Sequence, residues 1–388
     1  MEDTVQRNSA LNQMKAPTVV KKKKSTIPDE ILLNEELNRA IRQLPSNYNF
    51  EIHKTIHRIK SENIKNVALQ FPEGLLMYAC LLSDIFSTYA DAEILILSDV
   101  TYGACCIDDY TASILGAELL VHYGHSCLVP INITKIKVMY VFVEIYFDHS
   151  HLGELLRQHF KPESKLCIMG TIQFNTIISN IFNEVKEHFA QVYIPQAKPL
   201  SAAETLGCTS PILPESDALI FVADGRFHLE AAMIRNPNIP AFRYDPYCKT
   251  LSSESYDIEK MKEVRFQAIE KAKNGTTFGV ILGTLGHQGN PNIFNRINKL
   301  LISKGKQVIQ FLMAEIMPAK LSKLECIDVF VQVACPRLSI DWSNGFNKPL
   351  LTPYELEVAL NEIAWKEVYP MDYYSSDGGS WSNYYKDK

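Results

Sequence analysis

The sequence lacks the features that would assign it to several common classes of protein. No apolar run approaches the roughly 20 residues of a membrane-spanning helix, and the polar N-terminus has no hydrophobic segment typical of a secretory signal. Basic residues are not in excess, because 39 Lys and Arg stand against 44 Asp and Glu, a formal net charge of −5. Nucleic-acid-binding chains are usually basic. We therefore expect a cytoplasmic globular protein that does not bind membranes.

The nine cysteines also lack the spacing of a compact metal-binding motif, since no C-x-x-C pair occurs. A chain without a secretory signal keeps its cysteines as thiols in a reducing compartment. Buried free cysteine behaves by default as a small apolar residue. Any metal site must therefore be built from cysteines that only the fold brings together.

The two ends of the chain differ in composition from its middle. We expect a disordered tail at 1–27, where the run Lys21–Lys24 also leaves open a nuclear-import patch. We expect a second, loose tail at 372–388, which is rich in Ser and Gly and has no apolar period. Apolar spacing predicts a helix over 28–44.

Between the tails, one pattern of short apolar strands and helical stretches occurs three times, at intervals of about one hundred residues. Such alternation is typical of parallel sheets that are covered by helices on both faces. The sequence therefore predicts an α/β protein of three similar domains, each an open parallel sheet flanked by helices. The expected domains are 28–150 with the N-terminal helix, 151–265, and 266–371.

Each repeat has a cysteine in a turn-rich or small-residue segment after a strand: Cys105, Cys208 and Cys335. Ligands bind beyond the carboxyl ends of strands in such sheets, so three thiols can meet where three domains converge. Thiolates suit a soft metal centre. From the residues alone, three unrelated cysteines are the alternative. Adjacent side chains in an extended or turn segment point in different directions, so at most one of Cys105 and Cys106 is expected to face the site.

Two other segments contain residues that are typical of binding sites. His122, His125 and Cys127 could ligate zinc, although a histidine pair at a strand end is more often hydrogen-bonded structure. The glycine-rich loop 283–291 follows a predicted strand and precedes a helix, so its amides could hold a carboxylate or phosphate. That loop is neither a Walker A motif nor a complete G-x-G-x-x-G.

Nine segments between residues 69 and 372 match one family. They are Leu69–Leu75, Asp99–Asp109, Val121–Cys127, Asp224–Glu230, Arg243–Tyr247, Leu282–Gly286, Met313–Pro318, Cys335–Leu338 and Tyr369–Asp372. The sequence resembles the eukaryotic diphthamide biosynthesis protein 1 family, the catalytic subunit of 2-(3-amino-3-carboxypropyl)histidine synthase. The resemblance implies three domains in a pseudo-three-fold arrangement around a central [4Fe–4S] cluster.

The resemblance also implies the ligands of this cluster, one from each domain: Cys105, Cys208 and Cys335. Of the adjacent pair, Cys105 matches the family ligand because it directly follows Tyr-Gly-Ala. The C-x-x-x-C-x-x-C loop of ordinary radical S-adenosylmethionine enzymes is absent, as this family would have it.

S-adenosylmethionine binds at the open iron in the family, and we expect Gly286, Gln288 and Gly289 to contact it here. One position departs from the family, which usually has Arg where this chain has His287. A permanent cation is thereby replaced by a titratable imidazole.

The activity implied by the resemblance is that of a transferase. One-electron cleavage of S-adenosylmethionine would release 5′-methylthioadenosine, and the 3-amino-3-carboxypropyl group would add to C2 of a histidine of translation elongation factor 2. This is the first step of diphthamide biosynthesis. The implied partners are the diphthamide biosynthesis protein 2 paralogue in a heterodimer, a small electron-donor protein and elongation factor 2.

Two alternatives are open at this point. The chain could be the non-catalytic paralogous subunit of the same complex, although that subunit lacks a match for Cys208. It could instead be a zinc-stabilised α/β binding protein.

Overall fold

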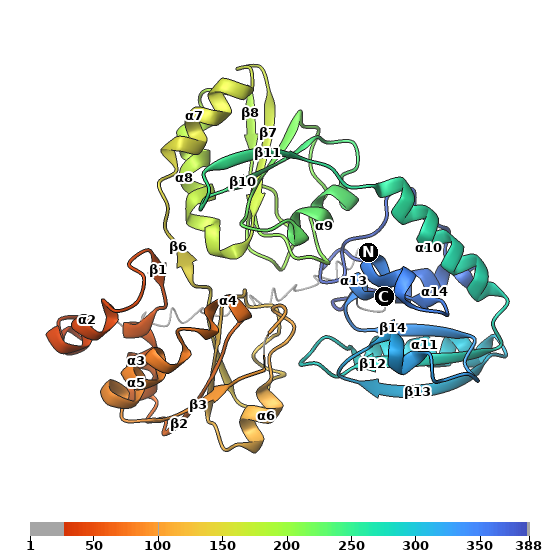
Figure 1. Cartoon of the computed structure of the whole chain (residues 1–388), viewed down its shortest axis with the longest axis horizontal. Helices are drawn as coiled ribbons and strands as arrows, with labels where there is room; N and C mark the ends of the chain where they lie inside the picture. The colour runs from red at the N-terminus through yellow and green to blue at the C-terminus, as the bar shows by residue number, and fades with distance from the viewer. Residues whose placement is uncertain (1–26, 100, 386–388) are drawn as a thin grey trace, which may run out of the picture.

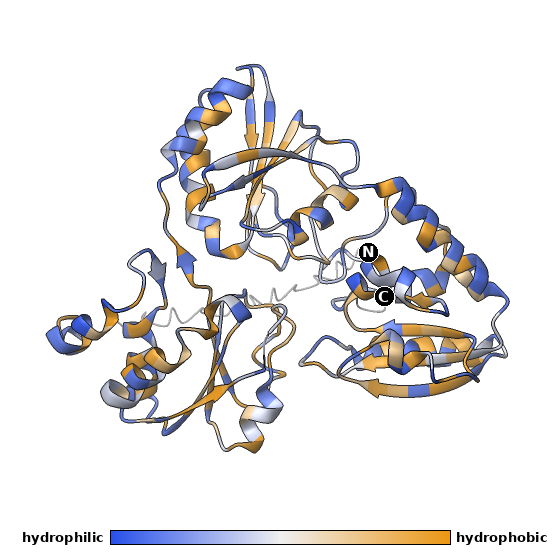
Figure 2. Ribbon diagram, viewed as in Figure 1, coloured by the Kyte–Doolittle hydropathy of each residue, from blue (hydrophilic) through white to orange (hydrophobic). Residues whose placement is uncertain are grey.

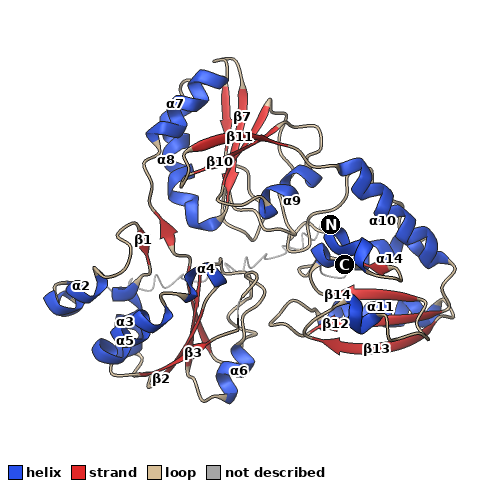
Figure 3. Cartoon of the chain, in the orientation of Figure 1, coloured by secondary structure: helices blue, strands red, loops and turns tan. Residues whose placement is uncertain are grey.

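The computed structural model describes residues 27–99 and 101–385 and shows three α/β units around a common centre (Figure 1). Helices and strands alternate along each unit, as the repeated pattern predicts (Figure 3). The tail expected at 1–27, with Lys21–Lys24, lies outside the described residues except for Ile27. Within the described ranges, no helix has the length and apolar character needed to cross a bilayer.

The first unit is a parallel sheet of order β3-β2-β4-β5. Its elements are α1 (Asp29–Leu32), α2 (Glu35–Ile41), α3 (Ile52–Ser61), β2 (Asn66–Gln70), α4 (Glu73–Leu76), α5 (Ala79–Ala90), β3 (Glu93–Leu97), α6 (Asp109–Ile114), β4 (Leu119–Tyr123) and β5 (Lys137–Val141). The single helix expected over 28–44 is wrong. Two helices form because the Asn34 side chain accepts a hydrogen bond from the Leu37 N–H and so caps α2.

The second and third units repeat the topology of the first. The second has α7 (Ser150–His159), β7 (Lys165–Gly170), η1 (Ile172–Phe174), α8 (Asn175–Val185), β8 (Gln191–Tyr193), β9 (Ala218–Val222), α9 (Phe227–Arg235), β10 (Ala241–Asp245) and β11 (Thr250–Glu254). The third has α10 (Ile258–Lys273), β12 (Thr277–Gly283), α11 (Pro291–Ser303), β13 (Gln307–Met313), α12 (Pro318–Leu321), β14 (Val329–Val333), α13 (Pro336–Trp342), η2 (Ser343–Gly345), β15 (Leu350–Leu351) and α14 (Pro353–Ala359). A short antiparallel pair, β1 (Tyr48–Asn49) with β6 (Glu144–Ile145), lies outside the three sheets.

In each sheet the first strand of the unit lies between the second and the third, and the fourth follows the third. The orders are β3-β2-β4-β5, β8-β7-β9-β10 and β13-β12-β14-β15, and the second sheet adds the antiparallel β11 at its edge. The predicted fold class is therefore confirmed. The three repeats also share one strand order, which the sequence did not predict. The expected boundary at 265/266 falls inside α10, whose Met261 and Ile269 pack in the core of the third unit. We therefore propose that the third unit starts at Ile258.

The central strands β4, β9 and β14 are buried along their whole length, which explains why they are apolar except for His122 in β4 and Gln332 in β14. The hydropathy colouring shows the same arrangement, with apolar strands inside and polar helix faces outside (Figure 2). The core of each unit thus lies between its sheet and its helices. The carboxyl ends of the strands remain available for loops that point toward the other units.

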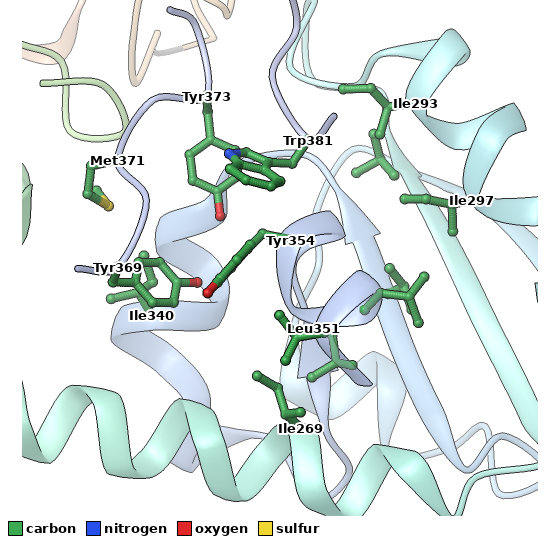
Figure 4. Packing of buried hydrophobic residues seen from close by; sticks show 14 of the residues in the cluster. Ile269, Ile293, Ile297, Ile340, Leu351, Tyr354, Tyr369, Met371, Tyr373 and Trp381 are labelled. Carbon is green, nitrogen blue, oxygen red and sulfur yellow. The ribbon is translucent and has the colours of Figure 1, made fainter. Parts of the chain in front are cut away.

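Residues 372–385, here called the C-terminal strap, are ordered parts of the structure, so the loose tail expected at 372–388 is wrong for this range. Tyr373, Tyr374 and Trp381 are buried, and the Trp381 Nε1–H donates to the Asp372 carboxylate at 2.6 Å. Figure 4 shows Tyr373 and Trp381 packed with Tyr354 of α14. Three aromatic anchors therefore fix a segment whose Ser and Gly content predicts a loose tail.

Candidate metal centre

The first unit places two thiols in the loop between β3 and α6. The Cys106 N–H donates to the Gly103 carbonyl at 2.9 Å, which closes a tight turn around Cys105. The two sulfurs are 4.0 Å apart, and Cys106 is buried while Cys105 is partly exposed. The Gln70 side chain at the end of β2 donates to the Cys106 carbonyl at 3.0 Å. The loop is thus tied to the carboxyl edge of its own sheet.

The second and third units each place one thiol at the same centre. In the loop between β8 and β9, Leu206 and Thr209 exchange backbone hydrogen bonds of 2.9 and 3.2 Å around Cys208. The Thr209 hydroxyl donates to the Cys208 sulfur at 3.7 Å. Cys335 directly precedes α13, two residues after β14 ends, and its carbonyl accepts from the Gln332 side chain at 2.9 Å.

The structure brings the three cysteines together. Cys105 lies close enough to Cys208 and Cys335 to interact with both electrostatically. Cys335 interacts in the same way with Cys106, and it raises the pKa of Cys208. Burial raises the pKa of Cys208 to about 12 and that of Cys335 to about 11. The hydrogen bond with Cys106, followed by burial, raises the pKa of Cys105 well above its ordinary value. These thiols therefore stay protonated unless a positive centre binds them.

The donor set fits a cluster better than a single metal ion. Among residues 27–99 and 101–385, no three His, Cys, Asp or Glu side chains are grouped so as to hold one ion. In an iron–sulfur cluster each thiolate binds a different iron, so its ligands stand farther apart than those of one ion. One soft donor from each unit, half-buried at a shared centre, has this character.

Arg337 fixes the second unit to the third beside this centre. Its guanidinium pairs with Glu230 of α9 at 2.5 Å and with Asp341 of α13 at 2.8 Å. The same group donates to the Gly207 carbonyl at 3.3 Å and lies 4.2 Å from the centre of the Phe227 ring. Because Gly207 immediately precedes Cys208, this buried cation holds the loop of the second cysteine from the third unit.

The loop after β12 fixes the first unit to the third in a similar way. The backbone N–H of His287 donates to the Cys105 carbonyl at 2.7 Å. The His287 imidazole pairs with the buried Asp109 of α6, also at 2.7 Å. Burial acts to raise the pKa of Asp109, but the hydrogen bonds from His287 and the Lys135 backbone together outweigh it, so the pKa is lowered. Gly286 has φ +55°, and a Cβ there would lie 2.7 Å from the Cys106 Cα.

The sequence comparison identifies the family. A family described as diphthamide synthesis protein matches residues 71–370. The chain belongs to this family. A relative from Dictyostelium discoideum, 2-(3-amino-3-carboxypropyl)histidine synthase subunit 1, is 53% identical over 369 residues, 93% of this chain and 78% of that protein. The relatives of the same name from Saccharomyces cerevisiae and Homo sapiens are 50% and 52% identical, over 96% and 92% of this chain and 89% and 82% of their own lengths.

A solved structure agrees with this membership. Dph2 from Pyrococcus horikoshii, crystallised with a 4Fe-4S cluster, matches with a TM-score of 0.69 and 26% identity, covering 84% of this chain and 93% of that one. The predicted family and fold are thereby confirmed. The chain is a diphthamide-synthesis enzyme, a transferase that acts at the first step of the pathway. The relatives' designation as subunit 1 indicates a synthase with more than one kind of subunit.

The histidine pair considered for zinc has another role in this member of the family. His122 Nε2 and His125 Nδ1 are 3.1 Å apart and share a hydrogen bond, and His122 Nδ1 is 2.8 Å from the Gln70 side-chain oxygen. Cys127 is exposed. Burial lowers the pKa of both histidines, so they form a neutral hydrogen-bonded chain that leads to Gln70 and the Cys106 carbonyl.

The residues expected to contact S-adenosylmethionine lie beside the thiols. The Gln288 amide donates to the Cys106 sulfur at 3.5 Å, and the Gly289 N–H donates to the Gly283 carbonyl at 3.1 Å. Gln288 also lines a cavity of about 10 Å³, which has room for roughly one water. Gly286 and Gln288 therefore meet the first unit at Cys106, whereas Gly289 braces its own loop. The contact of all three with S-adenosylmethionine stays a prediction.

Three residues at the centre were not identified from the sequence: Asp109, Arg337 and Tyr374. Asp109 and Arg337 lie within the family segments, but no local pattern pairs them with His287 or Glu230 across units. Tyr374 lies in the C-terminal strap, whose scattered aromatic residues have no apolar period. All three act between segments that are far apart in the sequence, and only the fold reveals such contacts.

Proposed function

We propose that the chain is the catalytic subunit that transfers the 3-amino-3-carboxypropyl group of S-adenosylmethionine to a histidine of elongation factor 2. The observation that carries this proposal is the convergence of three thiols, one from each unit. Cys105, Cys208 and Cys335 would hold a [4Fe–4S] cluster and leave one iron open. The cluster supplies one-electron chemistry when it is bound.

The residues of this chain contribute position and environment to that reaction. The Arg337 and His287 contacts hold two cysteine loops against the third unit, which carries the third cysteine. The three thiols are half-buried, and burial raises the pKa of Cys208 and Cys335, so access of water to the site is restricted. Such exclusion suits a reaction in which a reactive fragment must reach imidazole C2 before it meets solvent.

The proposed setting has three further elements. The chain would form a heterodimer with its diphthamide biosynthesis protein 2 paralogue, receive electrons from a small donor protein and act in the cytoplasm. The relatives' designation as subunit 1 supports a second subunit. Identities of 50% to 53% to proteins with that designation favour the catalytic chain over the paralogue.

Anaerobic purification together with the paralogue tests the proposal. We expect iron and acid-labile sulfide, a brown absorbance spectrum, and 5′-methylthioadenosine formed from S-adenosylmethionine under reduction. Cys208→Ser should fold and bind the paralogue, yet lose both the chromophore and the product, because serine is a poor donor for iron–sulfur chemistry. The exposed Cys248 provides the control, since Cys248→Ser should retain both. Full turnover with elongation factor 2 in Cys208→Ser would refute the three-cysteine site.

A further inference from the structure

The edge strand of the third sheet, β13, is long and exposed. It pairs in parallel with β12 along all seven of its residues and lies at the outer edge of the third unit (Figure 1). Along the described chain, no strand pairs with its other side. Four of its side chains are exposed, including the apolar Ile309 at 41% and Leu312 at 72%. One sheet edge therefore presents both backbone groups and apolar side chains to its surroundings.

The equivalent edge strands of the other two units, β3 and β8, are protected. β8 has only three residues, and Pro195 follows it after one residue, so a ladder along this edge could not extend far. β3 exposes a single side chain, the charged Glu93. Short length, proline and charge are common means by which a sheet edge is kept from pairing with another chain. β13 has none of these three, because it is long and contains no charged residue and no proline.

The two faces of β13 are already partly covered by its own unit. Phe311 and Met313 pack against the apolar cluster that includes Leu321 of α12. On the other face, Val308 packs against the cluster that includes residues of α11. Because side chains alternate along a strand, Ile309 extends the first apolar face and Leu312 extends the second. An added strand would cover both and would satisfy the outward backbone groups, so the edge fits an extended strand from another chain.

We propose that β13 is the edge through which this chain binds its paralogous subunit, by pairing with an edge strand of that subunit so that one sheet crosses both chains. The inference rests on the proposed function, which includes the heterodimer. The relatives' designation as subunit 1 indicates a second kind of subunit, and that subunit requires a binding surface on this chain. A long, uncharged edge is an aggregation hazard on a chain that works alone, and a permanent partner strand removes this hazard.

Ile309→Lys and Leu312→Lys test this, because both positions are exposed and lysine should leave the fold intact. The full chain would be purified together with the paralogue, and the dissociation constant measured by sedimentation velocity on dilution. We expect each variant to weaken the complex by roughly thirtyfold or more, as for a central interface residue. Ile131→Lys in the first unit is the matched control, since Ile131 is 69% exposed and its variant should bind the paralogue like the wild type.

Hydrogen–deuterium exchange of the wild type tests the pairing itself. The amides of Gln307–Met313 that point outward should exchange at least about tenfold more slowly in the complex than in the free chain, because a partner strand would accept their hydrogen bonds. This measurement needs no substitution. It therefore decides the matter if circular dichroism shows that the lysine variants are unfolded: protected amides support the inference, and amides that exchange equally fast in both states overturn it.

The remaining outcomes separate this inference from the proposed function. Wild-type affinity in both folded lysine variants, or an equal loss in Ile131→Lys, would overturn the inference and leave the cluster and its product intact. If the variants lose only self-association of this chain, the edge pairs two copies of it, and the inference is wrong. A wild-type chain that does not bind the paralogue contradicts the proposed heterodimer and this inference together. A bound complex without iron and sulfide contradicts the proposed activity alone.

Discussion

The two ends of the three sheets differ in how strictly they repeat. At the amino ends, each unit has an acidic side chain just before its third strand, and this side chain accepts N–H hydrogen bonds from the start of the first strand. These pairs are Glu118 with Lys65 and Asn66 at 2.7 and 3.1 Å, Asp217 with Lys165 at 2.8 Å, and Asp328 with Thr276 and Thr277 at 2.9 Å each. The amino ends thus retain one stabilising device in all three units.

At the carboxyl ends the units have diverged. Cys105 and Cys208 lie in long loops after the second strand, whereas Cys335 follows the third strand after a single residue. The third unit also supplies the groups that hold the other two loops: the Arg337 guanidinium on Gly207 and the His287 N–H on Cys105. The comparison teaches that the repeat persists where it stabilises the sheet and is lost where the site is assembled. At the site, the third unit holds the cysteine loops of the other two units.

The largest expected effect concerns the adjacent thiols at the carboxyl end of the first unit. Cys105→Ala should abolish iron retention, because this cysteine is the proposed ligand, whereas Cys106→Ala should retain most of the iron. Iron and sulfide per chain after anaerobic purification measure the difference. Equal loss in both variants would contradict the assignment of Cys105 and leave a cluster site in which both thiols take part.

Arg337→Met should destabilise the chain by about 2–3 kcal/mol, because it removes a buried cation, leaves the Gly207 and Phe227 carbonyls without their donor, and leaves Glu230 with the exposed Arg226 alone. Unfolding by urea, followed by tryptophan fluorescence, measures the change. Arg226→Met is the matched control, since Arg226 pairs with the same Glu230 from an exposed position and should cost about 1 kcal/mol or less. Similar losses in the two variants would show that Arg337 does not anchor the second unit.

Gly286→Ala should cost more than the roughly 1–2 kcal/mol of a left-handed backbone, because its Cβ would also meet the Cys106 backbone. Gly305 separates the two contributions, since it has φ +72° with no atom within 4 Å of an added Cβ. Gly305→Ala should therefore show the backbone cost alone in urea unfolding and keep its iron, whereas Gly286→Ala should lose iron as well. The same cost and iron content in both would show that the contact with Cys106 is unimportant.

These comparisons also define what the sequence could predict. The strands were predictable because buried parallel strands are apolar runs, and Ala218–Val222 is such a run. The three cysteines were candidates because each follows a strand in its own repeat, and the family resemblance implied that they are the cluster ligands. No local spacing connects them, because they are more than one hundred positions apart. The pair of His287 with Asp109 and the cation of Arg337 on Gly207 could not be predicted, since both depend on how separate units pack.

In the C-terminal strap, the sequence predicted too little structure. Its Ser and Gly content indicates a loose tail, but Tyr373, Tyr374 and Trp381 are buried against the other units. Composition describes the average of a segment, whereas three anchored aromatic side chains are sufficient to order it. The interruption of the N-terminal helix at Asn34 has the same origin, because one capping side chain overrides an apolar period.

The smallest expected effect is at the amino end, where Asp328→Asn should lower the melting temperature by about 1–2 °C at neutral pH. The side chain is exposed, and asparagine keeps one acceptor oxygen for the Thr276 and Thr277 amides. Hydrogen bonds from these amides lower the pKa of Asp328 from its ordinary 3.8 to about 2. Its folded pKa is depressed, so the contribution of this carboxylate is complete above about pH 4 and is lost as the pH falls toward 2. Differential scanning calorimetry of both proteins should therefore show a difference in melting temperature that narrows over this range. A difference independent of pH would mean that the charge of Asp328 does not stabilise the amino end of the third sheet.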